Sequence, residues 1–183
     1  MSEHAAPHTD LRLILEGRLV RDELRRFEPQ DGLAEPADEA GWLLPFSTWL
    51  SHDIDFWRQR HYPVALLLGP DADLDALYAH STPSDLQARV SLIAVDFPAY
   101  TDGRGYSLAQ LLRQQYGWQG ELRAVGDVMI DTMHYLARCG FDSFLVKPGH
   151  QPEQALAALA TFTQDYQKSY RHSAEVARLS PAR

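Results

Sequence analysis

Between residues 63 and 166 the sequence alternates short apolar runs with amphipathic stretches, and this rhythm restricts the fold more than any other feature. Each apolar run is nearly continuous, which is typical of strands buried on both faces of a parallel sheet. Each amphipathic stretch repeats apolar residues at helical spacing and predicts a helix. The expected strands are 63–69, 91–97, 121–126 and 141–147, and the expected helices are 71–80, 106–117, 127–140 and 152–166.

Strands that alternate with helices favour right-handed crossovers between parallel strands. The predicted fold class is therefore α/β, with a four-stranded, mostly parallel sheet built from repeated βα units. Four units do not close a barrel, so we expect the sheet to be open or to curl like half of one. Ahead of these units, "LRLILEGRLVRDELRRF" (11–27) places short apolar groups on both sides of Glu16 and Gly17. This pattern predicts an N-terminal hairpin or a pair of short strands.

The chain around Trp49 and Trp57 repeats apolar residues at helical spacing and predicts one tryptophan-rich helix that Ser47 or Thr48 caps. A length of 183 residues suits one domain with a real core and is short for two. We therefore expect three parts, namely a loose N-terminus (1–10), a single α/β domain (11–167) and a basic C-terminal tail (168–183).

Charge and cysteine content exclude several classes of function. The formal net charge is −8, from 17 Lys and Arg against 25 Asp and Glu, so the overall field repels nucleic acid and anionic membranes. Neither is expected as a partner. Cys139 is the only cysteine, so the chain forms no internal disulfide and cannot alone ligate an iron–sulfur cluster. The eight histidines show no pair at metal-site spacing, and we predict no metal.

The first residues of the chain and the lengths of its apolar runs indicate the cellular location. The first residues, "MSEHAAPHTDLRL", lack the cationic start and continuous apolar core of a signal peptide. No apolar run approaches the length that spans a membrane. The sequence thus predicts a cytoplasmic protein, and it leaves the oligomeric state open.

Polar residues gather where the second and third expected strands end. In parallel α/β proteins, ligands bind beyond the carboxyl ends of the strands. This edge receives Asp96 and the loop "TDGRGYS" (101–107), in which two glycines permit a tight turn or a close approach to a ligand. An arginine in such a place suits a carboxylate, phosphate, sulfate or sulfite. The catalytic candidates are Asp96, Asp102, Arg104 and Tyr106, and the anion-binding candidates are Arg104, Arg123, Gly126 and Asp127.

The charged and aromatic candidates also have structural interpretations. Arg104 can brace its own loop through an ion pair with Asp102 or Asp96. Tyr106 can pack as the first core residue of the following helix instead of contacting a ligand. Arg123 can lie buried beside a strand-end carboxylate or reach the surface. These alternatives remain open on the sequence alone.

Residues 126 and 127 precede an expected helix and permit two roles. Asp127 can cap that helix, or Gly126 and Asp127 can present helix-start amides to an anion. Cys139 stands at the expected end of the same helix, where the helix dipole disfavours a thiolate, so we expect a core cysteine rather than a nucleophile. Neither a phosphate-binding loop nor a strand-linked G-x-G-x-x-G occurs, and we assign no cofactor.

The stretch "FPAYTDGRGYSLAQLLRQQYGWQGELRAVGDVMIDTMHYLARCGFDSF" (97–144) closely resembles a family of small bacterial proteins of unknown function. An aromatic residue and proline are followed by DGRGYS, G-ELRAVGDV and RCGFD, in that order. The resemblance covers about a quarter of the chain, and "WLLPFSTWL" and "VALLLGPDADLDAL" upstream are similar as well. Members are labelled oxidoreductases of sulfite reduction and are typically encoded beside assimilatory sulfite reductase.

The resemblance implies a role in sulfite reduction and cysteine biosynthesis, with sulfite reductase or its electron donor as partner. A redox enzyme needs an electron carrier, and the chain shows neither a thiol pair nor a nucleotide fingerprint. Two hypotheses follow, and whether the protein is an enzyme stays open between them. In the first it is an accessory protein or oxidoreductase of assimilatory sulfite reduction. In the second it is an enzyme that binds a small anion, such as sulfite, sulfate or phosphate, at the strand-end Asp/Arg loop.

Overall fold

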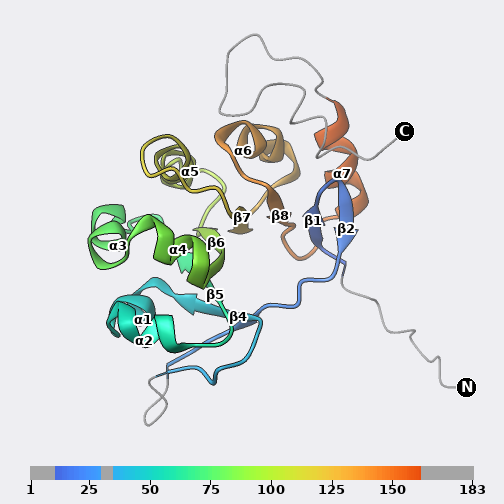
Figure 1. The fold of residues 1–183 in the computed structure, drawn as a ribbon. Helices are drawn as coiled ribbons and strands as arrows, with labels where there is room; N and C mark the ends of the chain where they lie inside the picture. Colours follow the sequence, from blue (N-terminus) through green and yellow to red (C-terminus); the bar gives the residue numbers. More distant parts are fainter. Residues whose placement is uncertain (1–10, 30–34, 162–183) are drawn as a thin grey trace, which may run out of the picture.

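The computed structural model describes residues 11–29 and 35–161, and a parallel group of strands forms its centre (Figure 1). These strands are β5 (Val64–Leu68), β6 (Val90–Phe97), β7 (Glu121–Gly126) and β8 (Ser143–Leu145). They pair in this order and run parallel throughout. Every residue of β5 is buried, as its continuous apolar run predicts. The α/β class and the parallel centre are therefore confirmed.

The sheet is nevertheless larger than predicted, because the described residues contribute eight strands rather than four. On one side, β4 (Trp42–Pro45) and β3 (Arg25–Arg26) continue the parallel arrangement. On the other side, β1 (Leu13–Leu15) pairs antiparallel with β8 and with β2 (Arg18–Val20). The N-terminal hairpin is confirmed. Both β3 and β4 are too short to show a strand pattern in the sequence.

The sheet curls like half of a barrel, with its helices on the outer, convex side (Figure 1). The strand order β2-β1-β8-β7-β6-β5-β4-β3 explains this shape, because each parallel strand lies next to the one before it in the chain. The segment between β2 and β3, coloured blue, crosses the other side of the sheet. Its Leu24 packs on the concave face against strand residues such as Ala65 and Ala94.

The helices depart from the predicted pattern mainly at their ends. The predicted single helix around Trp49 is two helices, because the Asp53 side chain accepts a hydrogen bond from the Phe56 amide and starts the second one. The helix after Thr82 was missed, although Thr82 and Asp85 form a capping box there. The helices are α1 (Phe46–Leu50), α2 (Ile54–Gln59), α3 (Leu74–His80), α4 (Pro83–Arg89), α5 (Arg104–Gln114), the 3₁₀ helix η1 (Ile130–Thr132), α6 (Met133–Cys139) and α7 (Pro152–Thr161).

The main core lies between the convex face of the sheet and the helices. Trp49 and Trp57 are buried there and stack with ring centroids 4.7 Å apart, so the predicted tryptophan-rich face is part of the core. The predicted loose N-terminus (1–10) and basic tail (168–183) lie outside the described residues. Within the described part of the chain, no helix is long and apolar enough to cross a membrane.

Candidate functional site

The stretch TDGRGYS is mostly the start of a helix rather than a loop. α5 begins at Arg104, which places Gly105 inside its first turn, where it is buried. A Cβ atom on Gly105 would lie 2.5 Å from the ring of Phe97, the last residue of β6. This glycine therefore lets α5 pack closely onto the end of β6, which accounts for it without a ligand.

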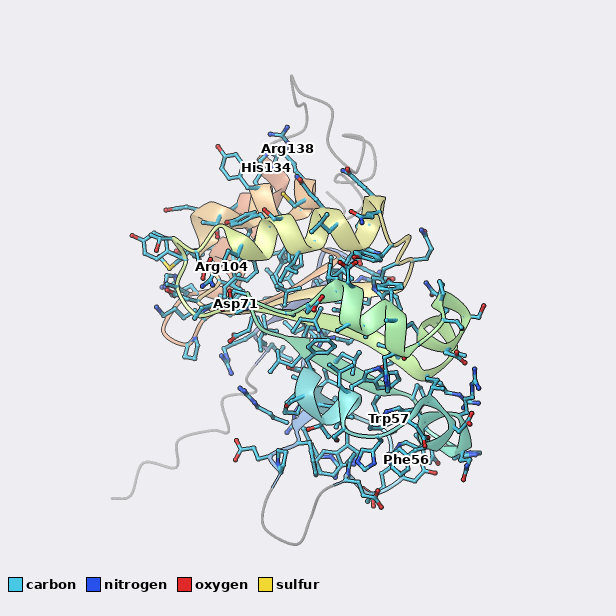
Figure 2. All side chains as sticks on the ribbon, turned by 90° about the vertical axis from the view of Figure 1, so that its left-hand side faces the viewer. Phe56, Trp57, Asp71, Arg104, His134 and Arg138 are labelled. Atoms are coloured by element: carbon cyan, nitrogen blue, oxygen red, sulfur yellow. The ribbon has the colours of Figure 1, made fainter. Side chains whose placement is uncertain are left out.

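Arg104 is held by carboxylates from two strand ends. Its Nε donates to Asp102 Oδ1 at 2.9 Å, its Nη2 donates to Asp102 Oδ2 at 2.6 Å, and its Nη1 bonds Asp71. Figure 2 shows Arg104 and Asp71 close together beside the helix. The guanidinium lowers the pKa of Asp102 to about 2. The ion pair with Asp102 is the bracing arrangement expected as an alternative, and the anion-binding role of Arg104 stays a prediction.

Arg123 lies buried on the concave face and is likewise occupied. Its Nη2 donates to Glu121 Oε1 at 2.8 Å, and its Nη1 donates to Asp22 Oδ1 at 2.8 Å. Its Nε also donates to Ser143 Oγ at 3.2 Å. Arg123 is thus buried between carboxylates other than the strand-end ones that the sequence suggested. It fastens the crossing segment to the sheet through Asp22.

Asp127 does not cap a helix, because two residues, Val128 and Met129, separate it from η1, and Met129 is the N-cap. Its carboxylate instead accepts from the Tyr100 amide at 3.0 Å and from Lys147 Nζ at 2.6 Å. Lys147 and the Tyr100 amide hold the pKa of Asp127 below its ordinary value. The interpretation of Gly126 and Asp127 as a helix start is therefore wrong. Lys147, which follows β8 at the same edge, was not among the site candidates.

Asp96 differs from every other candidate carboxylate at this edge. Alternation along β6 turns its side chain to the concave face, where it is half-buried. No described residue donates a hydrogen bond to it. Burial raises its pKa, and the positive charge of Arg26 opposes that shift. Gly126, at φ +88°, makes room for it, since a Cβ there would lie 2.5 Å from Asp96 Oδ1.

Tyr106 lies on the convex side, away from Asp96. It packs edge-on against Phe97, with ring centroids 5.4 Å apart, which is the predicted core role. It also lines a groove of about 410 Å³ between α5 and α6, together with Gln110, Tyr135, Arg138 and Cys139. Burial raises the pKa of both Tyr106 and Cys139, so neither is activated for ionisation.

The outer surface of α5 continues from that groove and is free of carboxylates. Ser107, Gln110, Leu111, Gln114 and Gln115 line a second groove along it. Leu111 follows the helical spacing of apolar residues on α5 but is 41% exposed, and Tyr135 on α6 is 59% exposed. Neither α5 nor α6 contains Asp or Glu, although the chain carries a net charge of −8.

The carboxyl edge thus brings together Asp96, Asp102, Arg104 and Asp127, but not Tyr106 or Arg123, which belong to the convex side and to the middle of the concave face. Arg26 was missed because β3 is only two residues long. Among the described residues, no three His, Cys, Asp or Glu side chains are grouped to hold a metal ion.

The fold and the edge define an α/β half-barrel protein with a mostly ion-paired carboxyl edge and a helical face without carboxylates. The chain belongs to the family described as "Bacterial protein of unknown function (DUF934)", whose family model matches residues 66–176. No curated protein and no solved structure matches it significantly. The matched region includes β6, β7 and β8 with the loops that follow them.

Proposed function

We propose that the protein is a cytoplasmic accessory protein of assimilatory sulfite reduction, which docks on sulfite reductase or on its electron donor. The docking surface is the α5–α6 face, defined as Tyr106, Gln110, Leu111, Tyr135 and Arg138. The resemblance of residues 97–144 to proteins of sulfite reduction supports the pathway. The observation that carries the docking role is the exposure of Leu111 and Tyr135 on two neighbouring helices without a carboxylate.

The composition of this face suits a protein partner. The centres of protein interfaces are depleted in charged residues and enriched in tyrosine and arginine, and tyrosine and arginine often dominate the binding energy. A face without carboxylates also matters in a chain of net charge −8, because it is where another acidic protein can approach with the least repulsion. The two grooves share Gln110 and thus form one continuous surface.

The alternative, an enzyme that binds a small anion through the Asp/Arg loop, has less support from the geometry. It requires Arg104 and Arg123 to contact the ligand. Each of these arginines already bonds two carboxylates. An added anion would have to displace them, so the accessory role is the better supported one.

The test is binding of the full chain to sulfite reductase holoenzyme and, separately, to its electron donor, measured by biolayer interferometry. We expect one of the two to bind, and Leu111→Asp to weaken binding about tenfold or more, because a buried charge at an interface centre is unpaired. Tyr62→Asp is the matched control, since Tyr62 is 42% exposed but lies before β5, and it should bind normally.

Failure of the unaltered protein to bind either partner, together with unchanged sulfite reduction in cells that lack it, would overturn the proposal. Equal weakening by Leu111→Asp and Tyr62→Asp would instead remove the assignment to the α5–α6 face. Circular dichroism of both variants checks that they fold.

A further inference from the structure

The two grooves on the α5–α6 face join into one. Figure 1 shows α5 and α6 side by side on the convex side of the sheet. The first groove, of about 410 Å³, lies between them, and the second, of about 350 Å³, runs along the outer surface of α5. Gln110 lines both, and its Nε2 donates to Cys139 Sγ at 3.6 Å, which links the two helices at this point. We call the two together the α5–α6 groove.

The α5 side of this groove is a stripe of residues at helical spacing. Its members stand at positions i, i+3, i+4 and i+7 and therefore lie one above the other over two turns of the helix. They are Ser107, Gln110, Leu111 and Gln114, and all four are exposed. The outer face of a surface helix typically carries charged residues among its polar ones, whereas this stripe has none and includes an exposed leucine. We call it the α5 stripe.

The hydrogen bonding of this face favours a helix as its occupant. An extended segment binds by main-chain hydrogen bonds to the edge of a sheet, and α5 offers none because its backbone groups are bonded within the helix. The other common mode is an amphipathic helix that lays one face into a groove between side chains. The α5 stripe extends about 10 Å along the helix axis, so a helix of about two to three turns covers it.

The charge of the lining indicates the composition of that helix. Among the described residues that line the α5–α6 groove, Arg138 is the only charged side chain, and it lies in the last turn of α6. The groove therefore favours a negative group over a positive one. A guanidinium forms its strongest hydrogen bonds with a carboxylate. The α5 stripe, in contrast, suits uncharged and apolar side chains.

We propose that the α5–α6 groove binds an amphipathic helix of the partner protein, whose uncharged face packs on the α5 stripe and whose Asp or Glu at the margin bonds Arg138. This inference rests on the proposed accessory function and names the kind of segment that the partner presents. A basic helix would be repelled by Arg138, and an extended segment would leave its own backbone groups unpaired against the helices.

The experiment repeats the biolayer interferometry with sulfite reductase holoenzyme and with its electron donor. Arg138→Glu tests the charge, and Gln110→Trp fills both parts of the groove. We expect each to weaken binding about tenfold or more, because the first opposes two like charges and the second excludes the helix. Ser107→Trp, at the start of the α5 stripe, is a second filling variant and should weaken binding as well.

Two matched controls carry the same replacements elsewhere. Arg18→Glu changes the net charge equally at an exposed position on β2, and Gln87→Trp adds the same ring at an exposed position on α4. Both should bind as the unaltered protein does. Circular dichroism confirms that all variants fold before affinities are compared.

Hydrogen–deuterium exchange of the complex identifies the occupant directly. The segment of the partner that gains protection should be a helix that carries an Asp or Glu. A protected segment that is extended or has no carboxylate would overturn the inference.

The binding results separate this inference from the proposed function. Binding that Leu111→Asp weakens but Arg138→Glu or both filling variants leave unchanged would overturn only the helix in the groove. Equal losses in Arg138→Glu and Arg18→Glu would also overturn it, because net charge would then explain the effect. Absence of binding by the unaltered protein to either partner would overturn the accessory function and this inference with it.

Discussion

Two arginine–aspartate combinations, Arg104 with Asp102 and Arg26 with Asp96, stand in contrasting settings. Arg104 and Asp102 stand two residues apart at the start of α5 and are joined directly, with Asp71 on the remaining side of the guanidinium. Arg26 and Asp96 come from distant parts of the chain and influence each other without contact. The first pair is complete and braces a helix start. In the second pair neither group forms an ion pair with a described residue, and Asp96 is half-buried on the concave face.

The contrast follows from chain geometry. An aspartate two residues before an arginine can pair with it through local turns, whatever the rest of the fold does. The distance between Arg26 and Asp96 depends instead on how the sheet curls, because two other strands lie between β3 and β6. Charged groups that stay unpaired in such a position lower stability, and proteins commonly retain such groups where function needs them.

The largest effect is expected at the complete, buried counterpart, Arg123. Arg123→Met leaves Glu121 and Asp22 without their cation on the concave face. Removing one partner of a buried pair is costly, and we expect the free energy of unfolding to fall by about 3 kcal/mol in urea denaturation. A small loss of stability together with loss of oxyanion binding would instead make Arg123 a ligand residue.

Gly126→Ala tests how closely β7 approaches Asp96. The added methyl requires a strained backbone at φ +88° and meets Asp96 Oδ1 and the Phe97 carbonyl at 2.5 Å. We expect a loss of about 1–3 kcal/mol in the same denaturation experiment. Gly69→Ala is the control, because a Cβ atom at Gly69 would meet no atom within 4 Å. Equal effects of the two substitutions would contradict the close approach.

Asp96→Asn should stabilise the protein at neutral pH. Burial raises the folded-state pKa of Asp96, so the ionised form is disfavoured in the folded protein and its charge costs stability at pH values above that pKa. We expect Tm at pH 7 to rise by about 1–3 °C. The gain should disappear below the ordinary pKa, where both states are protonated. A lower Tm at pH 7 would show that Asp96 has a stabilising partner.

The smallest effect at neutral pH is expected for Arg104→Gln, because the arginine side chain is 53% exposed and solvent screens its ion pairs. The contribution of the Arg104–Asp102 ion pair to stability should change with pH in the acid range. Arg104 lowers the pKa of Asp102 to about 2, so its contribution is present above the ordinary value of 3.8 and is lost as pH falls toward 2. Melting curves from pH 7 to 2 should show the two proteins converging at the acid end. A difference in Tm between the two proteins that stays constant from pH 7 to 2 would contradict the ion pair between Arg104 and Asp102.

The repeated part of the fold could be predicted from the sequence, whereas the assembly of the sheet edges could not. Continuous apolar runs indicated β5 to β8, because burial on both faces removes polar residues from a strand. β3 and β4 carry too few residues for such a pattern, so the true width of the sheet was missed. Leu111 follows the helical spacing of α5 but lies at the margin of its apolar face, and spacing alone does not reveal which margin the neighbouring helix covers.

The candidate site was likewise predicted only in part. The rule for strand ends correctly brought Asp96, Asp102, Arg104 and Asp127 to one edge. It did not reveal that Asp102 pairs with Arg104, that Asp127 bonds Lys147 or that Arg123 is bonded to Asp22. That last partner comes from the crossing segment, whose path across the concave face depends on the curl of the sheet. Arg26 was missed because its strand, β3, is only two residues long.

The most direct test of the contrast is a carbon-detected NMR titration of the Asp96 and Asp102 side-chain carboxyls in one sample. The structure predicts that the pKa of Asp96 lies above the ordinary 3.8 and that the pKa of Asp102 lies near 2. In Arg26→Gln the pKa of Asp96 should rise further, while that of Asp102 should not move. A pKa of Asp96 at or below 3.8, or one indifferent to Arg26, would contradict the account of Asp96 as a half-buried carboxylate without an ion-pair partner, on which Arg26 acts at a distance.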